Sequence, residues 1–361
     1  MSASENEVEF VTSGMFIIDE IEFDGGKKIR DIIGGGGSFA LVGARIWSST
    51  AESKRLRLIV DKGSDFPESV KTELDGLDAG IVYRETPERK TTYGYNRVHD
   101  NGLRLFEYLS PKKPIRAQDL VETGSMESKT IHVITSPKNF ISMSEEIAKY
   151  GSLTDRPKVI WEPTPESCCP ENWPVCQKAM KYCDIFSPNE VDTANLLAVD
   201  IKEAKERAEQ FAYALQEMQI GSNGQGWAVL RCGSAGCFIA PSTSRTAPHQ
   251  DEVLAQRDVI HLPSVPMAPN SVLDTTGAGN TFCGALILEY HRTGNIVLSS
   301  VKATVAASFA IQQHGLPKLT KTENGIDLWN GESAFQRLKA YYEYLQNHDI
   351  ESVRQVTKHG F

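Results

Sequence analysis

Short apolar runs alternate with helix-like segments along most of the chain. Several runs are continuously apolar, as expected for strands that helices cover on both faces. The regular alternation predicts an α/β fold with a mainly parallel central sheet. The predicted strands span residues 8–14, 56–61, 79–83, 130–135, 157–162, 183–187, 226–231, 236–240 and 258–262.

Helices are predicted between and after these strands. The clearest covers 201–218, where apolar residues recur at steps of three and four and charged residues take the opposite face. Further helices are expected at 279–292, 296–313 and 332–347. The apolar face of the first helix consists of Ile201, Ala204, Ala208, Phe211, Ala212, Leu215 and Met218.

Two segments, 15–33 and 90–109, break this pattern because they alternate apolar and polar residues. The second is typical of a hairpin with its turn at 100–102. The two segments could pair as a small sheet outside the main one, and such a sheet over the carboxyl ends of parallel strands would form a lid. We expect one domain over 1–361 with these lid elements inserted. Four residues of the hairpin could meet a substrate, but alternation turns only half of them inward: Lys90, Thr91, Thr92 and Tyr95.

Composition narrows the class of protein. Hydrophobic residues make up 40% and charged residues 24%, which is ordinary for a globular protein. The net charge of −9 argues against direct binding to nucleic acid. The chain has no run of 18 apolar residues, so we expect no membrane contact. Its start lacks the pattern of a signal peptide, which favours a cytoplasmic location.

Seven cysteines are present, and an odd number without a leader favours reduced thiols. The group Cys168, Cys169, Cys176 and Cys183 raises the question of zinc. It contains no C-x2-C knuckle and the sequence offers no paired histidines, so we do not predict a zinc site. Cys283 follows a predicted helix start and is interpreted as a packed helix residue.

Candidate chemistry gathers in "SVLDTTGAGNTFCGAL" (271–286). Gly277, Ala278 and Gly279 let the backbone turn tightly and expose successive N–H groups, and a helix follows them. Such a helix start is an anion site, and its donors can stabilise the charge of a transferred phosphoryl group. A purely structural glycine turn is the alternative.

This stretch resembles the C-terminal signature of the PfkB, or ribokinase-like, carbohydrate kinases, commonly D-T-x-G-A-G-D. The resemblance implies a three-layer αβα sandwich with a mainly parallel sheet and a small β lid. It also implies ATP and Mg2+ as cofactors and a small sugar or alcohol as substrate. In that family the loop is an anion hole, and its last Asp takes the proton from the substrate hydroxyl. Here that position is Asn280.

Two N-terminal stretches extend the resemblance to the substrate side. "SGMFIIDEI" is similar to the family's first strand and implies that Asp19 binds sugar hydroxyls. "GGGGSFALVGARIW" (34–47) resembles the N-terminal glycine signature and implies substrate contacts from Gly35, Gly36 and Ser38, although the family often has Asn near Ser38.

Three later stretches resemble the nucleotide side. "FSPNEVDTANLL" (186–197) implies that Asn189 binds nucleotide and Asp192 binds Mg2+. "ATVAASFAIQQHGL" (303–316) resembles the helix beside the adenine pocket. The stretches "GMFIIDEI", "GGGGSFALVGAR", "WEPTP" and "DTTGAGN", in this order, resemble a fungal branch of the family, the maintenance-of-killer proteins. "VLRCGSAGCFI" (229–239) and the loop itself add four nucleotide-binding candidates: Arg231, Gly233, Gly236 and Thr275.

The amide at Asn280 cannot accept a proton as a carboxylate can. General-base assistance is worth about 10²–10⁴-fold, but phosphoryl transfer depends mostly on positioning and electrostatics. Asn280 can therefore still orient a hydroxyl. Asp19 is an alternative base, whereas His99 and His314 are interpreted as structural. Glu162 either caps a turn before Pro163 or touches substrate or Mg2+ through water.

Two hypotheses follow. The first is an ATP-dependent kinase of a sugar or related alcohol, slow because its base is missing. The second is a pseudokinase that binds nucleotide or metabolite and serves as a scaffold for a protein partner. An exposed lid edge strand could also pair two copies into a homodimer.

Overall fold

The computed structural model describes residues 7–99, 104–150, 156–243 and 259–348. Its main sheet has nine strands in the order β13-β12-β11-β10-β9-β8-β1-β4-β5. Pairing is parallel from β5 to β11 and antiparallel at β12 and β13. All the predicted strands are present: β1 (Phe10–Thr12), β4 (Leu56–Gly63), β5 (Gly80–Thr86), β8 (Thr130–Thr135), β9 (Lys158–Pro163), β10 (Ile185–Phe186), β11 (Trp227–Arg231), β12 (Cys237–Pro241) and β13 (Ile260–Leu262).

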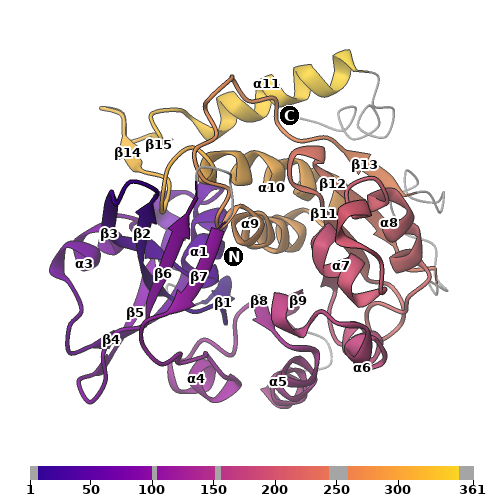
Figure 1. Ribbon diagram of the computed structural model, residues 1–361, viewed down its shortest axis with the longest axis horizontal. Helices are drawn as coiled ribbons and strands as arrows, with labels where there is room; N and C mark the ends of the chain where they lie inside the picture. The colour runs from indigo at the N-terminus through magenta and orange to yellow at the C-terminus, as the bar shows by residue number, and fades with distance from the viewer. Residues whose placement is uncertain (1–6, 100–103, 151–155, 244–258, 349–361) are drawn as a thin grey trace.

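Helices cover both faces of this sheet (Figure 1). Successive side chains of a strand point to opposite faces of the sheet, so Phe10 packs in the hydrophobic cluster on one face and Val11 in the cluster on the other. One face carries α1 (Gly36–Ile46), α3 (Glu68–Asp75), α9 (Ala278–Thr293), α10 (Ile296–Ala310) and α11 (Ala334–Asn347). The other carries α4 (Ala117–Glu122), α5 (Pro137–Tyr150), α6 (Trp173–Met180), α7 (Glu190–Leu196) and α8 (Ala208–Gln216). A one-turn helix, α2 (Thr50–Ser53), lies at the rim.

Helices α1 and α9 approach each other through glycines. A Cβ at Gly43 would collide with the carbonyl oxygen of Thr281, and a Cβ at Gly284 would collide with that of Ala40. The two backbones therefore touch, and this contact fixes the start of α9 against α1.

The helix predicted over 201–218 is wrong in its first two turns. The Asp200 side chain accepts a hydrogen bond from the Lys202 N–H and begins a 3-10 turn at Ile201–Glu203. Helix α8 begins only at Ala208, and Ile201 is 54% exposed instead of buried. The side chain of Asp200 thus favours a 3-10 turn where the spacing of apolar residues predicted an α-helix.

The two segments with alternating polarity form a separate four-stranded sheet, as predicted. Its order is β3-β2-β6-β7, with β2 and β6 parallel and the outer pairs antiparallel. We call this sheet the lid: β2 (Ile17–Phe23), β3 (Lys28–Gly34), β6 (Tyr93–Val98) and β7 (Arg104–Tyr108). The predicted turn at 100–102 lies outside the described residues. A short hairpin, β14 (Leu319–Lys321) with β15 (Asp327–Trp329), is also present.

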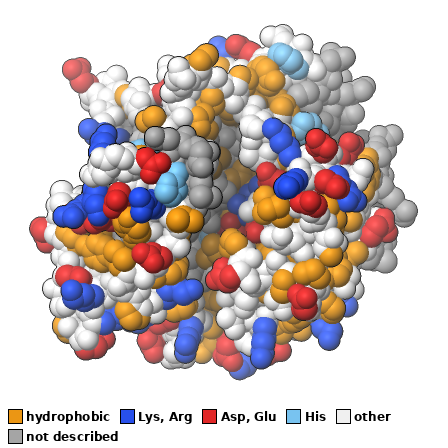
Figure 2. Space-filling view, viewed as in Figure 1, with side chains coloured by type: hydrophobic (Ala, Val, Ile, Leu, Met, Phe, Trp, Pro, Cys, Tyr) orange, Lys and Arg blue, Asp and Glu red, His pale blue; other side chains and the backbone are white. Residues whose placement is uncertain are grey.

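The lid lies beside the main sheet in Figure 1, and the molecular surface is hollowed between the lid and the side formed by α7 and α8 (Figure 2). Acidic and basic side chains are mixed over this view. The described ranges contain no helix of the length and apolarity that crossing a bilayer requires. All seven cysteines are free thiols.

Candidate active site

The glycine loop enters α9 through a left-handed residue. Gly277 has a φ of 77° and precedes the first helical residue, Ala278. The Phe39 ring fills the space where a Cβ at Gly277 would lie, so both the backbone and the packing require glycine there. Asp274 braces the loop, because its Oδ1 accepts a hydrogen bond from the Thr276 N–H at 2.9 Å. Thr275 lies exposed on the same loop.

Arg231, at the end of β11, lies against the first turn of α9. A Cβ at Gly279 would collide with its Nη1 atom. Its Nη2 atom donates to the Ser187 carbonyl at 3.0 Å and pairs with Glu162 Oε1 at 2.8 Å. The side chain is 11% exposed. The structure thus brings a nearly buried positive charge beside the predicted anion loop.

Glu162, at the end of β9, is the centre of this network. Its Oε2 atom accepts a hydrogen bond from Asn280 Nδ2 at 2.8 Å and lies 3.2 Å from His132 Nε2. His132 Nδ1 is held in turn by the Thr12 hydroxyl at 2.9 Å. Glu162 is therefore a buried carboxylate that contacts Arg231, His132 and Asn280 at once.

The network keeps Glu162 ionised. Burial alone would raise the pKa of this carboxyl, but the Arg231 guanidinium and the hydrogen bonds from His132 and Asn280 outweigh burial and lower the pKa to about 2. The same Glu162 charge helps to hold the pKa of Arg231 above its ordinary value. The site therefore retains a carboxylate, but at position 162 instead of 280.

Asp192 behaves in the opposite way. Burial raises the pKa of its carboxyl to about 6, with the Arg231 charge opposing the rise and the Glu162 charge adding to it. Asn189 caps α7, accepting a hydrogen bond from the Asp192 N–H at 2.7 Å. Asn189 also forms a β-bridge with Arg231, which places the Asp192 segment beside the Arg231–Glu162 pair.

Two donor sets were tested for a cation. His132, Glu162 and Cys283 offer ligand atoms within 4.8 Å of one another. They do not fit a metal, because both Glu162 oxygens already have donors and burial raises the pKa of the Cys283 thiol to about 12. Asp192 lies outside that group but does fit Mg2+, which commonly takes one or two carboxylates together with substrate phosphates.

The predicted substrate residue Asp19 lies on lid strand β2, within the segment 15–33 that was expected to form part of the lid. Its carboxylate occupies the space that a Cβ at either Gly34 or Gly94 would fill, so the two flanking strands make room for it. Asp19 is 6% exposed, and Asn96 on β6 is buried near it. Asn96 was missed in the sequence, although it lies two residues after Gly94 and therefore on the same face of the strand.

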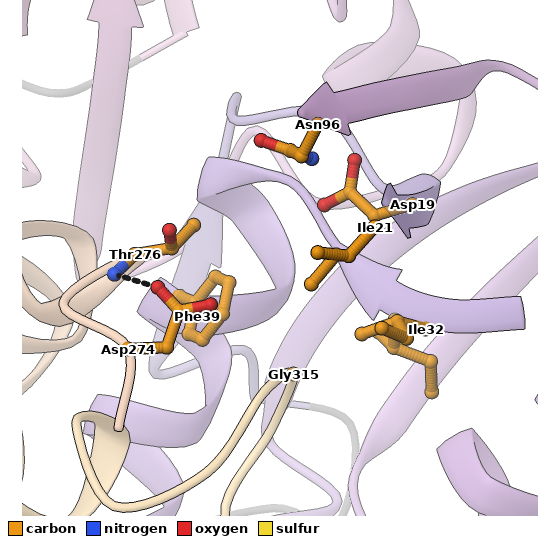
Figure 3. Close-up of a pocket in the computed structure, with 9 residues that line it drawn as sticks. Asp19, Ile21, Ile32, Phe39, Asn96, Asp274, Thr276 and Gly315 are labelled. Atoms are coloured by element: carbon orange, nitrogen blue, oxygen red, sulfur yellow. Dashed lines mark hydrogen bonds between the residues drawn. The ribbon is translucent and has the colours of Figure 1, made fainter. Parts of the chain in front are cut away.

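Asp19 and Asn96 line a narrow pocket beneath the lid (Figure 3). Asp19, Asn96, Ile21 and Ile32 form the lid side, and Asp274, Thr276 and Gly315 lie opposite, with Phe39 between the two groups.

Gly35 and Gly36 connect this pocket to the anion loop. Gly35 has a φ of 90° and precedes α1, and a Cβ at Gly36 would lie 3.2 Å from Asn280 Nδ2. Ser38 is fully buried in α1, and Phe39 lines the pocket beside it. Because Asp19 fills the space above Gly34 and Asn280 lies against Gly36, one glycine turn contacts both residues.

The remaining predicted residues are less central. Gly236 packs against β13, where a Cβ would collide with the Leu262 carbonyl, and Gly233 is exposed in a 3-10 turn. His99 pairs with Asp24, and His314 pairs with Asp274 at 2.8 Å. Two of the hairpin positions form structural hydrogen bonds: the Thr91 hydroxyl accepts one from the Gly63 N–H, and the Tyr95 hydroxyl donates one to Glu22. Of the other two, Lys90 is exposed and Thr92 is buried.

The main sheet covered on both faces, with a small sheet beside it, is the arrangement of the ribokinase-like fold. The ribokinase of Cryptococcus neoformans, solved in complex with ADP, superimposes with a TM-score of 0.62 and 17% identity. The match covers 86% of this chain and 95% of that one. The structural likeness therefore defines the class of protein by its fold.

Sequence comparison gives the particular family. The sequence profile of the pfkB family of carbohydrate kinases matches residues 144–322. The chain is 66% identical to the protein C16C9.01c of Schizosaccharomyces pombe over the full length of both. It is 32% identical to protein MAK32 of Saccharomyces cerevisiae, covering 92% of this chain and 91% of that one. The chain belongs to the pfkB carbohydrate kinase family.

Proposed function

We propose that the protein is an ATP-dependent phosphotransferase that acts, slowly, on a hydroxyl of a sugar or related alcohol. The observation that carries the proposal is the continuity of the two half-sites. The buried lid carboxylate of Asp19 fills the space above Gly34, and Asn280 at the end of the loop Gly277–Asn280 lies against Gly36, so one glycine turn joins the two half-sites.

The roles follow from chemistry. The Asp19 carboxylate accepts hydrogen bonds from hydroxyl groups of the substrate, and the Asn96 amide can both accept and donate them. The N–H groups at the start of α9 receive the transferred phosphoryl group, and Arg231 supplies a positive charge beside them. Asp192 would hold Mg2+, which neutralises phosphate charge when bound. Ser38, Asn189, Gly233, Gly236 and Thr275 remain candidate contacts.

The loop itself offers no efficient base for the proton of the substrate hydroxyl. Asn280 cannot accept it, and Glu162 is a weak base because its pKa is about 2. Asn280 instead orients the hydroxyl while Glu162 holds the amide in place. Loss of a general base costs about 10²–10⁴-fold, so we expect a slow enzyme.

A second function is favoured by the same network. Arg231 forms an ion pair with Glu162, and Asn280 donates a hydrogen bond to it. The polar groups nearest the loop therefore already bind one another instead of a ligand. A protein of this kind could bind nucleotide and metabolite without transferring phosphate, and act as a scaffold for a protein partner.

A product assay separates the two functions. The purified protein is incubated with Mg-ATP and a panel of sugars, nucleosides and polyols, and new phosphorylated products are read by mass spectrometry. Product from the native chain that disappears in Gly279→Asp supports the kinase, since the new carboxylate would repel phosphate and displace Arg231. A thermal shift with Mg-nucleotide and no product from any acceptor supports the scaffold.

A further inference from the structure

Asp274 places an acidic side chain close to the loop that is proposed to receive a phosphoryl group. It lies three residues before Gly277, and its side chain is only 4% exposed. Its Oδ1 atom accepts the Thr276 N–H, while its Oδ2 atom lies 2.8 Å from His314 Nδ1. A carboxylate in this place opposes the binding of an anion at the loop unless a cation compensates it.

His314 lies in the turn that follows α10, and this turn is bound to the loop. The N–H groups of Leu273 and Asp274 both donate to the carbonyl of Ile311, at 2.8 and 3.3 Å. The His314 side chain therefore meets Asp274 from a turn that is itself fixed to the loop backbone. It is 23% exposed, so its ring can exchange protons with solvent.

The other contact of the His314 ring comes from the lid. Phe23, the last residue of β2, has its ring centroid 5.4 Å from that of His314, with the two planes inclined by 59°. The next residue, Gly315, lies against β3, because a Cβ there would meet Cγ2 of Ile32 at 2.7 Å. Figure 3 shows Gly315 and Asp274 facing Ile32 across the narrow pocket. The lid and the loop therefore meet at His314 and Gly315.

The described contacts around the His314 ring involve two charged side chains. Asp274 contacts Nδ1 from the loop, and Lys27, in the turn between β2 and β3, has its Nζ 5.8 Å from the centroid of the Phe23 ring. Lys27 is exposed, so water and salt screen its charge, whereas Asp274 is nearly buried and is screened much less. An imidazolium at position 314 therefore has its counter-ion in direct contact.

We propose that His314 is a positioning residue that makes anion binding at the loop depend on a proton. The inference rests on the proposed function, because it takes the start of α9 as the phosphate site. With its second proton, His314 compensates the charge of Asp274 and attracts the ring of Phe23. Without it, the imidazole keeps a neutral hydrogen bond, and the charge of Asp274 is left to oppose phosphate.

The direction of the pH dependence follows from linkage. A proton on His314 and a phosphate at the loop strengthen each other, since each binds more tightly when the other is present. Histidine is the side chain that ordinarily changes its charge between pH 5 and 8. Through His314, the affinity for nucleotide should therefore be higher at pH 6 than at pH 8.

The test compares dissociation constants for Mg-ADP at pH 6 and pH 8, measured by calorimetry. The terminal phosphate of ADP and the Asp192 carboxyl titrate in the same range, so each variant is judged against the native chain at the same pH. His314→Gln keeps a hydrogen-bond donor but cannot be charged. It should bind at least about fivefold more weakly than the native chain at pH 6, and equally at pH 8.

His314→Lys tests the opposite sign, because it holds a positive charge at both pH values. It should bind Mg-ADP like the native chain at pH 6 and more tightly than the native chain at pH 8. Phe23→Leu removes the lid ring and keeps the contact with Asp274. It should weaken binding about twofold or more at pH 6 and leave it unchanged at pH 8, because the ring attracts only the charged form.

His99→Gln is the matched control. His99 forms the same kind of pair with Asp24, at 3.0 Å, and is 25% exposed, but both residues follow lid strands. Its dissociation constants should equal the native values at both pH values. An equal loss at pH 6 and pH 8 in His314→Gln would reveal a merely structural role and overturn the inference. So would an effect of His99→Gln that matches that of His314→Gln.

Two further outcomes separate the inference from the proposed function. The expected pH dependence without a phosphorylated product from any substrate would defeat the kinase activity and leave the role of His314 standing. Absence of Mg-ADP binding by the native chain at both pH values would overturn the inference together with the proposed nucleotide site.

Discussion

At the scale of single residues, the main feature of the site is where its negative charge lies. Asn280 is neutral, yet its amide nitrogen is 2.8 Å from the ionised Glu162, which also pairs with Arg231. Replacing Asn280 by the family's usual Asp therefore adds a second carboxylate to a position that already contains one. The change cannot simply restore an ordinary active site.

We expect Asn280→Asp to introduce a pH-dependent loss of stability. Two carboxylates in contact raise the pKa of one of them, so the variant gains a group whose stabilisation is present at low pH and lost as pH rises through the raised value. The melting temperature of Asn280→Asp should fall below that of the native chain between pH 5 and 8. Adding Glu162→Gln should recover it. Parallel melting curves for Asn280→Asp and the native chain across that range would contradict the close contact.

Arg231→Met is expected to destabilise the protein by about 3–5 kcal/mol, because it leaves the nearly buried Glu162 charge without its cation. The double variant Arg231→Met/Glu162→Gln should lose clearly less than the single one. Urea unfolding measures both free energies. If the single and double variants were equally stable, the Arg231–Glu162 pair would not be the interaction that holds the site together.

At the scale of elements, the site depends on the contact between α1 and α9. Gly43 and Gly284 let these helices touch, and α9 carries the anion loop at its first turn. The atoms that an added Cβ would meet belong to backbone, so neither helix can yield by a side-chain rotation.

Gly284→Ala should therefore cost about 1–3 kcal/mol as an overpacked helix contact. It should also weaken any thermal shift produced by Mg-nucleotide, because the loop moves with α9. Gly76→Ala is the control, since Gly76 has a φ of −64° and a Cβ there would have its nearest neighbour at 3.2 Å. Equal unfolding free energies for the two variants would argue against close α1–α9 packing.

The elements show how far the sequence could be interpreted. Strands such as β8 and β9 were predictable because they are continuously apolar, and the lid because its polarity alternates. The first turns of the 201–218 helix were not, since the Asp200 cap competes with the periodic pattern. Glu162 was undervalued because its partners come from β8, β11 and α9, and no sequence spacing relates such distant residues. Asp19 was predicted within the lid segment 15–33, and it lies on lid strand β2.

At the scale of the whole molecule, two carboxylates near Arg231 give opposite contributions to stability. The pKa of Glu162 is lowered to about 2, so its contribution is present above the ordinary value and is lost as pH falls toward 2. The pKa of Asp192 is raised to about 6, so its contribution is greatest in acid and is lost as pH rises through 6. Between pH 2 and pH 6, Glu162 is ionised and Asp192 is mostly neutral, which is the charge state that each environment favours.

Asp192→Asn should then raise the melting temperature above pH 6 and have little effect near pH 4, because the amide removes a buried charge that forms only at the higher pH. Scanning fluorimetry from pH 4 to 8 measures this difference. The same variant should lose any stabilisation by Mg2+ with nucleotide. A melting temperature that falls at pH 8 would mean that the Asp192 charge is compensated in the fold.

The buried pairing of Glu162 with Arg231 also bears on how such a site can change over generations. A lineage that alters either residue alone passes through a protein with an uncompensated interior charge, and one that restores an acid at position 280 alone passes through a crowded pair of acids. Each single step is penalised, although the combined change is not. The three positions are therefore expected to be exchanged as a set, and the present arrangement resists gradual reversal.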